Sequence, residues 1–333
     1  MKRVTIYDVA KEANVSLATV SRVINSVDVV RKDTRERVEA AIKRLGYKPN
    51  AIAQGLALSK TTTIGLVVPE ASFTFTGNVI NGLLDVARIY KYNIMLNTTT
   101  EGISEISDII ESIIKSRVDG VVIYNDKMDY SMLKELTNYD IPIVIINNKV
   151  SDEKLSSVYI DIARAVYEKV DEYIKTGRKK IGIIQDRKNN FACQLMIDGA
   201  KKAYEENGLS FDGFIQIPGT YRTSYDFLSD HLKEERYDLL LAYRDSQAFA
   251  AVNAAEENGL SVPNDLEIIC IIDTKYNSMV RPRISSFSIP SYDLGAVAMR
   301  VLTKMLKNDD AYEHEIELNY LYTERESTKP AKK

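Results

Sequence analysis

The chain has 333 residues, 45% of them hydrophobic and 27% charged, which is typical of a folded protein with one or two sizeable cores and an additional small module. No apolar run approaches the roughly 18 residues of a membrane span, and the start, MKRVTIYDVAKEA, lacks the apolar stretch of a secretory signal, so we expect a cytoplasmic protein without a membrane partner. The net charge of −3 divides unevenly, because residues 1–60 carry twelve Lys and Arg against six Asp and Glu, a net of +6 that favours contact with a phosphate backbone.

Two short helices are predicted near the start of the chain. The segment TIYDVAKEANVSLATVSRVINS predicts a helix over about Ile6–Lys11, a turn at residues 13–15 and a second helix with Ser16 as its N-cap. This is helix-turn-helix spacing. With about 100° of rotation per residue, the second helix has an apolar face made by Val20, Val23 and Ile24. Its opposite face carries Leu17, Ala18, Ser21 and Arg22.

The opposite face has the chemistry of a helix that reads DNA in the major groove. Its small and apolar residues suit thymine methyl groups, and Arg22, one turn further on, has the forked donors that match guanine. The helix N-terminus and the hydroxyls of Ser16, Thr19 and Ser21 suit phosphates. The alternative is a helical hairpin that only packs against the rest of the protein.

A third helix and a linker follow. In DTRERVEAAIKRLGYKPN we expect Asp33 and Glu36 to form a capping box and Gly46 to end the helix. Its apolar stripe is made by Val38, Ala41, Ile42 and Leu45. Residues 49–60 contain a run of about eight residues that Asn50 can cap, which is too short to be a stable helix alone. We expect this linker to be helical only when it is held by another molecule.

The segments TIYDVAKEANVSLATVSRVIN, RLGYKPNAIAQGLA and KTTTIGLVVP resemble the opening of the LacI/GalR family of bacterial repressors. The resemblance implies a DNA-binding domain over residues 1–48 and a hinge helix over residues 49–60 that folds on the operator, pairs across a homodimer and inserts Leu56 into the minor groove. Gln54 stands where many relatives have Arg. The DNA-binding residues so implied or predicted are Thr5, Tyr7, Ser16, Leu17, Ala18, Thr19, Ser21, Arg22, Asn25, Tyr47, Asn50, Ala53 and Leu56.

Residues 61–333 show apolar runs that alternate with helical patterns. The runs expected as strands are IGLVVP, YNIMLN, VDGVVIYN, IPIVIIN, KKIGIIQD, DGFIQIPG, YDLLLAY, LEIICII, ISSFSIP and EIELNYLY. The intervening patterns expected as helices are NVINGLLDVARIYK, SDIIESIIKS, YSMLKEL, QLMIDGAKKAYEENG, AFAAVNAAEENG and SYDLGAVAMRVLTKML. This alternation predicts an α/β body of two doubly wound parallel sheets. We expect an N-lobe of about residues 61–159 and 290–318 and a C-lobe of about residues 160–289 and 319–333.

The body lacks the signatures of an enzyme. Cys193 and Cys270 are not in a metal-ligand spacing, and His231 and His314 lie in charged contexts without a nucleophile pattern nearby. No strand is followed by a Gly-rich phosphate loop. We therefore predict no catalytic residues, no metal and no cofactor, and we expect a ligand cleft between the lobes at the carboxyl ends of the strands.

The body resembles the periplasmic-binding-protein-like core of the same family. ARIYKYNI, SMVRPRISSFSIPSYDLGAVAMRVLTKM and ERESTK are similar to a group of carbon catabolite regulators within it. The resemblance implies a corepressor, the serine-phosphorylated phosphocarrier protein of the sugar phosphotransferase system, which docks on the N-lobe. By resemblance and helical spacing the corepressor-binding residues are Tyr292, Asp293, Val297, Arg300, Thr303, Lys304 and Arg325.

The helix SYDLGAVAMRVLTK carries a suitable surface for this partner. Asp293, Val297, Arg300 and Lys304 recur on one helical face. Arg300 and Lys304 are a pair that can clamp a phosphoserine dianion. The alternative is an ordinary solvated helix. Glu70 and Asn78 stand where the group usually has Asp and Glu.

The expected cleft departs from that of sugar-responsive relatives. Ile272 and Met196 stand where many of them place an Asp and an Arg, and Asp273 and Asp245 are the acidic residues left nearby. Without polar anchors a free sugar would be desolvated without partners. The candidate effector residues are therefore Asp245 and Asp273, for a weak sugar-phosphate modulator.

We predict a transcription regulator that binds pseudo-palindromic operators as a homodimer and mediates carbon catabolite control with the phosphorylated carrier. The rival within this class is a local repressor that responds to a small sugar or sugar phosphate. A solute-binding or sensor protein would use the same lobes but would not need a capped recognition helix or a cationic segment over residues 1–60. An enzyme would need perturbed acid, base or nucleophilic groups in the cleft.

Overall fold

The computed structural model describes residues 4–25, 29–48, 61–99, 103–124, 136–150, 152, 155–186, 191–217, 220–309 and 311–330. The chain divides into two compact units, residues 1–63 with 117–119 and residues 64–116 with 120–333. The expected hinge helix over residues 49–60, with Asn50, Ala53 and Leu56, lies outside the described residues.

The first unit contains three short helices: α1 (Ile6–Ala13), α2 (Leu17–Ile24) and α3 (Lys32–Leu45). Asn14 adopts a left-handed conformation that ends α1, and the Ser16 hydroxyl accepts the amide of Thr19 at the start of α2. Apolar residues of all three helices form one small core, made by Val9, Ala10, Ala13, Val20, Val23, Val38 and Ala41. The predicted helix-turn-helix is confirmed.

The predicted start of α3 is wrong, because the helix begins before Asp33. Arg31 occupies the N-cap position without a side-chain hydrogen bond, so Asp33 already lies in the first turn. A carboxylate that caps a helix in this way is found instead at α1, where Asp8 accepts both the amide and the hydroxyl of the N-cap residue Thr5, at 2.8 and 2.7 Å. The predicted end is correct, since Gly46 has φ +63° and caps α3.

The N-lobe is built on a six-stranded sheet in the order β11-β5-β4-β3-β1-β2. Its strands are β1 (Thr63–Val68), β2 (Asn93–Thr98), β3 (Gly120–Tyr124), β4 (Ile143–Ile146), β5 (Leu155–Tyr159) and β11 (Glu315–Glu317). The recorded pairings are parallel. Its helices are α5 (Thr74–Ile89), α6 (Ile103–Lys115), the 3-10 turn η1 (Leu136–Asn138) and α12 (Ser291–Leu306).

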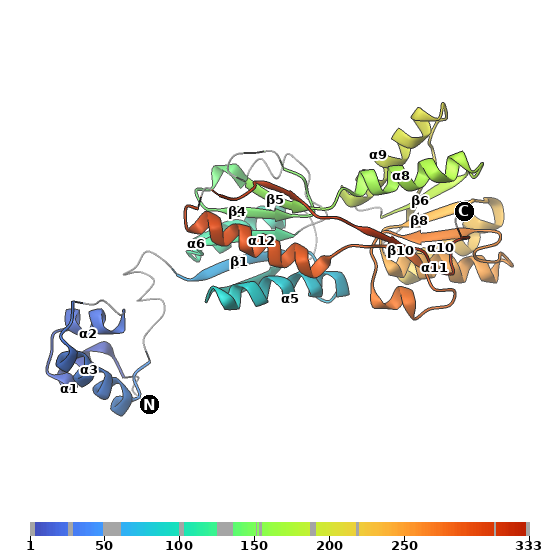
Figure 1. The fold of residues 1–333 in the computed structure, drawn as a ribbon. Coiled ribbons are helices and arrows are strands. Elements are labelled where there is room, and N and C mark those ends of the chain that lie inside the picture. Colours follow the sequence, from blue (N-terminus) through green and yellow to red (C-terminus); the bar gives the residue numbers. More distant parts are fainter. Residues whose placement is uncertain are drawn as a thin grey trace. The chain divides into compact units, whose positions relative to one another are not determined.

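Helices α5 and α12 run side by side at backbone contact distance (Figure 1). A Cβ added to Gly82 would lie 2.0 Å from the Tyr292 carbonyl oxygen, and one added to Gly295 would lie 1.9 Å from that of Val79. These two glycines therefore allow an approach that no larger residue permits. The helix pair is therefore packed closely on one face of the N-lobe sheet.

The C-lobe is built on a second six-stranded sheet in the order β12-β10-β9-β8-β6-β7. Its strands are β6 (Ile181–Asp186), β7 (Phe214–Ile217), β8 (Leu239–Ala242), β9 (Glu267–Cys270), β10 (Ser285–Ser288) and β12 (Leu321–Thr323). The pairings are parallel except that of β10 with β12. Its helices are α8 (Ile162–Lys175), α9 (Phe191–Glu206), α10 (Tyr221–Glu234), α11 (Asp245–Glu257) and the 3-10 turn η2 (Lys275–Ser278).

The chain passes between the two sheets three times, from β5 to α8, from β10 to α12 and from β11 to β12. The first and third passages are bonded to each other: the Leu318 amide donates to the Tyr159 carbonyl at 2.9 Å, and Arg164 pairs with Glu317. The expected single strand EIELNYLY is therefore wrong. It is two strands of different sheets, because the chain crosses between lobes at residues 318–320. The two-lobed α/β fold is confirmed.

Candidate nucleic-acid interface and regulatory surfaces

Helix α2 has one buried and one open face, as its sequence predicts. Val20 and Val23 are buried in the core of the first unit, whereas Leu17, Ala18 and Arg22 are exposed. Leu17 keeps 37% of its surface in water although it is apolar. An exposed apolar residue beside a cation on a short capped helix is suited to base edges and thymine methyl groups.

Two hydroxyls mark the N-terminal end of α2. The Ser16 hydroxyl accepts the Thr19 amide at 3.2 Å and lies 2.9 Å from the Thr19 hydroxyl. Ser16 therefore caps the first turn, and a helix N-terminus of this kind favours an anion. No carboxylate of the described residues forms an ion pair with Arg22, so its guanidinium keeps its donors for an external acceptor.

The other predicted DNA-binding residues of this unit differ in exposure and in their contacts within the unit. Tyr7 is 68% exposed on α1, and Thr5 forms the cap of that helix. The Asn25 amide lies 3.4 Å from the Ser21 hydroxyl, and Tyr47 packs partly into the small core. Most of the Tyr7 side chain is thus available to a partner, whereas Thr5 and Tyr47 also have structural roles.

Four residues of α12 that the sequence predicts for docking lie along one stripe of the N-lobe. Asp293 and Arg300 are exposed, and Val297 and Lys304 are partly exposed along the same stripe. The Lys304 ammonium donates to the Ala311 carbonyl at 2.8 Å. Arg300 has no ion-pair or hydrogen-bond partner within the part of the chain that the structure describes. Arg300 is therefore the cation of this face with the most free donors.

Asp85 of α5 extends this face across the helix pair. Its Oδ2 accepts the Tyr292 hydroxyl at 2.9 Å, and its Oδ1 accepts Arg88 Nη1 at 2.9 Å. The hydrogen bond to Asp85 raises the pKa of Tyr292 above its ordinary value. Tyr292, which is 44% exposed, is thereby held in one orientation. The sequence alone did not indicate Asp85, because it precedes Tyr292 by 207 residues and only the α5–α12 packing brings them together.

Two residues predicted for docking lie away from the face. Thr303 is 2% exposed, and its hydroxyl donates to the Met299 carbonyl at 2.8 Å within α12. Arg325 belongs to the C-lobe and is not brought together with Arg300. Thr303 lies on the buried side of the amphipathic helix α12. Arg325 lies just after β12 and takes part in a different polar network.

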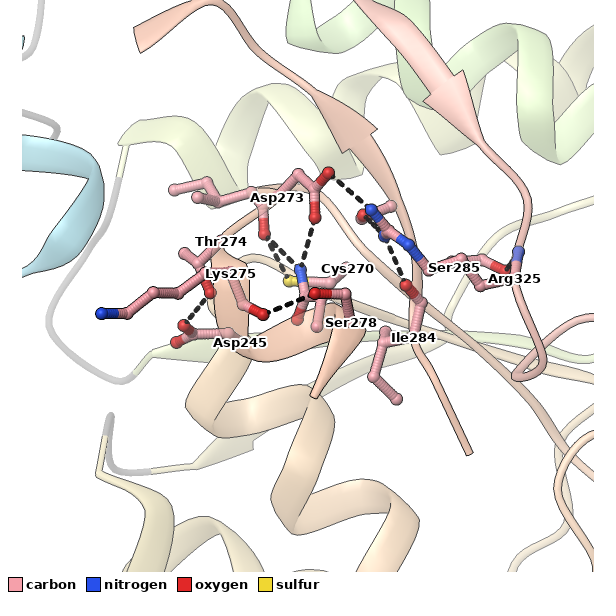
Figure 2. A network of polar contacts seen from close by, with 12 residues as sticks. Asp245, Cys270, Asp273, Thr274, Lys275, Ser278, Ile284, Ser285 and Arg325 are labelled. Atoms are coloured by element: carbon pink, nitrogen blue, oxygen red, sulfur yellow. Dashed lines mark hydrogen bonds and ion pairs between the residues drawn. The ribbon is translucent and has the colours of Figure 1, made fainter. Parts of the chain in front are cut away.

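Arg325 is the centre of that network (Figure 2). Its guanidinium donates to Asp273 at 2.8 Å, to the Ile284 carbonyl at 2.7 Å and to the Ser286 hydroxyl. Asp273 also lies 3.3 Å from the Asn277 amide. The side chains of Arg325 and Asp273 are each only 16% exposed. The two residues predicted for different ligands are therefore bound to each other.

Asp245, the second candidate effector residue, is likewise bound within the C-lobe. It is 8% exposed and accepts the Thr274 hydroxyl at 2.6 Å and the Ser246 amide at 2.7 Å. Figure 2 shows Asp245 pointing at Thr274, next to the segment that carries Asp273. A sugar hydroxyl would have to displace these internal donors, so neither acid is a free anchor.

The described residues contain no cluster of three or more metal-ligating side chains. Both cysteines are buried, and burial raises the pKa of the Cys270 thiol. None of the helices in the described part of the chain is long and apolar enough to cross a membrane.

A helix-turn-helix head in front of a two-lobed body of this kind defines a DNA-binding transcription regulator. Residues 5–50 match the model of the bacterial regulatory proteins, lacI family, and residues 170–328 match the periplasmic binding protein-like domain. The chain is 36% identical over 332 residues to catabolite control protein A of Priestia megaterium, with 98% of this chain and 99% of the relative covered. The chain belongs to the lacI family and is close to its catabolite control proteins.

Solved structures agree with this assignment. The lac repressor dimer bound to operator and the anti-inducer ONPF superposes with a TM-score of 0.86 at 22% identity, covering 98% of this chain and 99% of that one. The transcription regulator CcpA of Lactococcus lactis has a TM-score of 0.71 at 28% identity, covering 80% of this chain and 99% of that one. The former match supports the fold alone.

Proposed function

We propose that this protein is a homodimeric regulator of carbon catabolism that binds pseudo-palindromic operators, with the serine-phosphorylated phosphocarrier protein as its corepressor. The observation that carries the proposal is the exposed face of α12, where Arg300 has no partner among the described residues. A phosphoserine dianion supplies the acceptors that such a guanidinium lacks. The relatives named catabolite control protein A support the same assignment.

Two heads are needed to read two half-sites, which is why the proposal includes a dimer. The dimeric lac repressor structure supports this arrangement by analogy of fold. On this proposal α2 enters the major groove, and Leu17, Ala18 and Arg22 contact bases. The contributions of Asn50, Ala53 and Leu56 to the minor groove belong to the same proposal.

The surface around Arg300 also explains why the partner would be a protein with a phosphate group. Val297 adds an apolar contact and Asp293 an acidic one on the same stripe, and Tyr292 is held outward by Asp85. A free phosphate would use only the cation. A protein surface can use all four groups, which favours a phosphoprotein over a small anion.

The test is operator binding by the full-length protein at fixed salt, alone and with the phosphorylated carrier, the unphosphorylated carrier or a sugar phosphate. We expect only the phosphorylated carrier to tighten binding, by roughly 5- to 150-fold for a coupling of about 1–3 kcal/mol. Arg300→Glu should abolish the enhancement but leave carrier-free operator binding and dimerisation intact. Lys201→Glu, a charge reversal of an exposed cation on α9, is the matched control.

Indifference to the phosphorylated carrier together with a response to the sugar phosphate would contradict the proposal. The protein would then be a local repressor controlled by a small molecule. An equal loss with Arg300→Glu and Lys201→Glu would show that net charge, and not the α12 face, determines the response.

A further inference from the structure

An ion pair joins the two lobes outside the three chain passages. Arg244 of the C-lobe directly precedes α11, and its Nη1 lies 3.0 Å from Oε2 of Glu70, which follows β1 in the N-lobe. The Arg244 guanidinium also lies over the ring of Phe73, 4.7 Å from its centroid. Only 23% of the Arg244 side chain is exposed. One C-lobe cation thus contacts both an acid and an aromatic ring of the N-lobe.

Each end of this contact is anchored in its own lobe. The Arg244 amide donates to Gln247 Oε1 at 3.2 Å, and the Arg244 carbonyl accepts the amides that begin α11. Glu70 Oε1 accepts the Ser72 hydroxyl at 3.0 Å. Phe73 stacks at 6.3 Å on the buried Phe75. The contact therefore links ordered parts of the two lobes.

Both ends also follow the carboxyl ends of parallel strands. Glu70 comes two residues after β1, and Arg244 two residues after β8. This is the edge at which the two lobes of such a protein face each other around a ligand. Here protein groups of opposite charge meet at that edge, and no small molecule is needed to join them.

We propose that Glu70, Phe73 and Arg244 form an interlobe latch that holds the two lobes in the arrangement of this structure without a small molecule, and that this arrangement is the one that binds operator. The second half rests on the proposed function. Arginine suits the task because its planar guanidinium pairs with a carboxylate and stacks on a ring at the same time. Partial burial keeps the pair from being fully screened by salt.

The latch is tested by amide hydrogen exchange on the full-length protein without DNA or carrier. The peptides of interest cover residues 66–75 and 241–248, one at each end of the latch. Glu70→Gln and Arg244→Gln should each speed exchange about two- to five-fold in both peptides, including the one that carries no substitution. Glu111→Gln, which breaks the exposed Glu111–Lys115 pair of α6, is the matched control and should leave both peptides unchanged.

A charge-exchanged variant, Glu70→Arg with Arg244→Glu, controls for faster exchange that is caused by a general loss of structure. It should return both peptides toward wild-type exchange, because it restores an ion pair between the lobes. A change confined to the substituted peptide, or no rescue in the exchanged protein, overturns the latch.

Operator affinity separates the two halves of the proposal. Glu70→Gln should weaken carrier-free operator binding by about two- to five-fold if this arrangement of the lobes is required for binding. Faster exchange with unchanged affinity overturns the link to operator binding. Failure of the phosphorylated carrier to act on the wild-type protein would contradict the proposed corepressor, whereas the exchange result on the latch would stand.

Discussion

Replacing Arg325 with Ala should destabilise the C-lobe. The substitution removes the donors to Asp273, to the Ile284 carbonyl and to Ser286. Asp273 would then keep its hydrogen bond from the Asn277 side-chain amide at 3.3 Å. Breaking a fully buried ion pair costs about 3–5 kcal/mol. Because both side chains retain 16% exposure, water compensates in part, and we expect a loss of about 2–4 kcal/mol.

The measurement is urea unfolding of the full-length protein, followed by circular dichroism and by the fluorescence of its 20 Tyr residues, since it contains no Trp. Glu326→Gln is the control. Glu326 pairs with Arg283 next to the same segments, but these side chains are 42% and 50% exposed, so the midpoint should change much less. Arg325→Ala combined with Asp273→Ala should recover part of the loss, because no unpaired charge is left.

The same variants distinguish a structural from a docking role of Arg325. A wild-type unfolding midpoint in Arg325→Ala, together with a lost response to the phosphorylated carrier, would refute the structural reasoning. Arg325 would then act at the docking face despite its contacts with Asp273. A lowered midpoint with the carrier response retained would support the assignment made from the structure.

Two further predictions concern packing. Gly295→Ala should cost about 1–3 kcal/mol in unfolding free energy, because its Cβ would lie 1.9 Å from the Val79 carbonyl oxygen; Gly77→Ala on α5 meets nothing within 4 Å and should be neutral or stabilising. Equal effects of the two would contradict the close approach of α5 and α12. Cys193 and Cys270, which are 1% and 0% exposed, should react with a thiol reagent only as the protein unfolds, and fast reaction of the native protein would show that either site opens readily.

Elements with local signals could be predicted from the sequence. Ser16 caps α2 and Gly46 ends α3, and each signal lies within a few residues of the element it bounds. Strand β5 was not predicted, because Ser156 and Ser157 interrupt its apolar pattern although both are buried. Helix α8 does have a local signal, because its apolar residues recur at helical spacing, although the predicted elements do not include it. Helix α10 was not predicted either.

Contacts between distant segments could not be predicted in the same way. Asp273 and Arg325 are 52 residues apart and belong to segments that only the sheet order brings together. In the sequence, Asp273 is an acid near the expected cleft and Arg325 is a cation in a motif, and these positions predict a separate ligand for each. The sequence shows where a charged residue stands, but only the folded structure shows whether it has a partner within the protein.

The presence or absence of an internal partner distinguishes Arg325 from Arg300 as binding residues. Both are arginines in segments that resemble catabolite regulators, and the resemblance implies a docking role for each. Arg325 already donates to three acceptors of its own lobe, so an external phosphate would have to compete with them. Arg300 is exposed and has no partner among the described residues, so an external phosphate would gain a charge-assisted bond without breaking an internal one. The docking role of Arg300 stays a prediction, and it is the one that the folded chain favours.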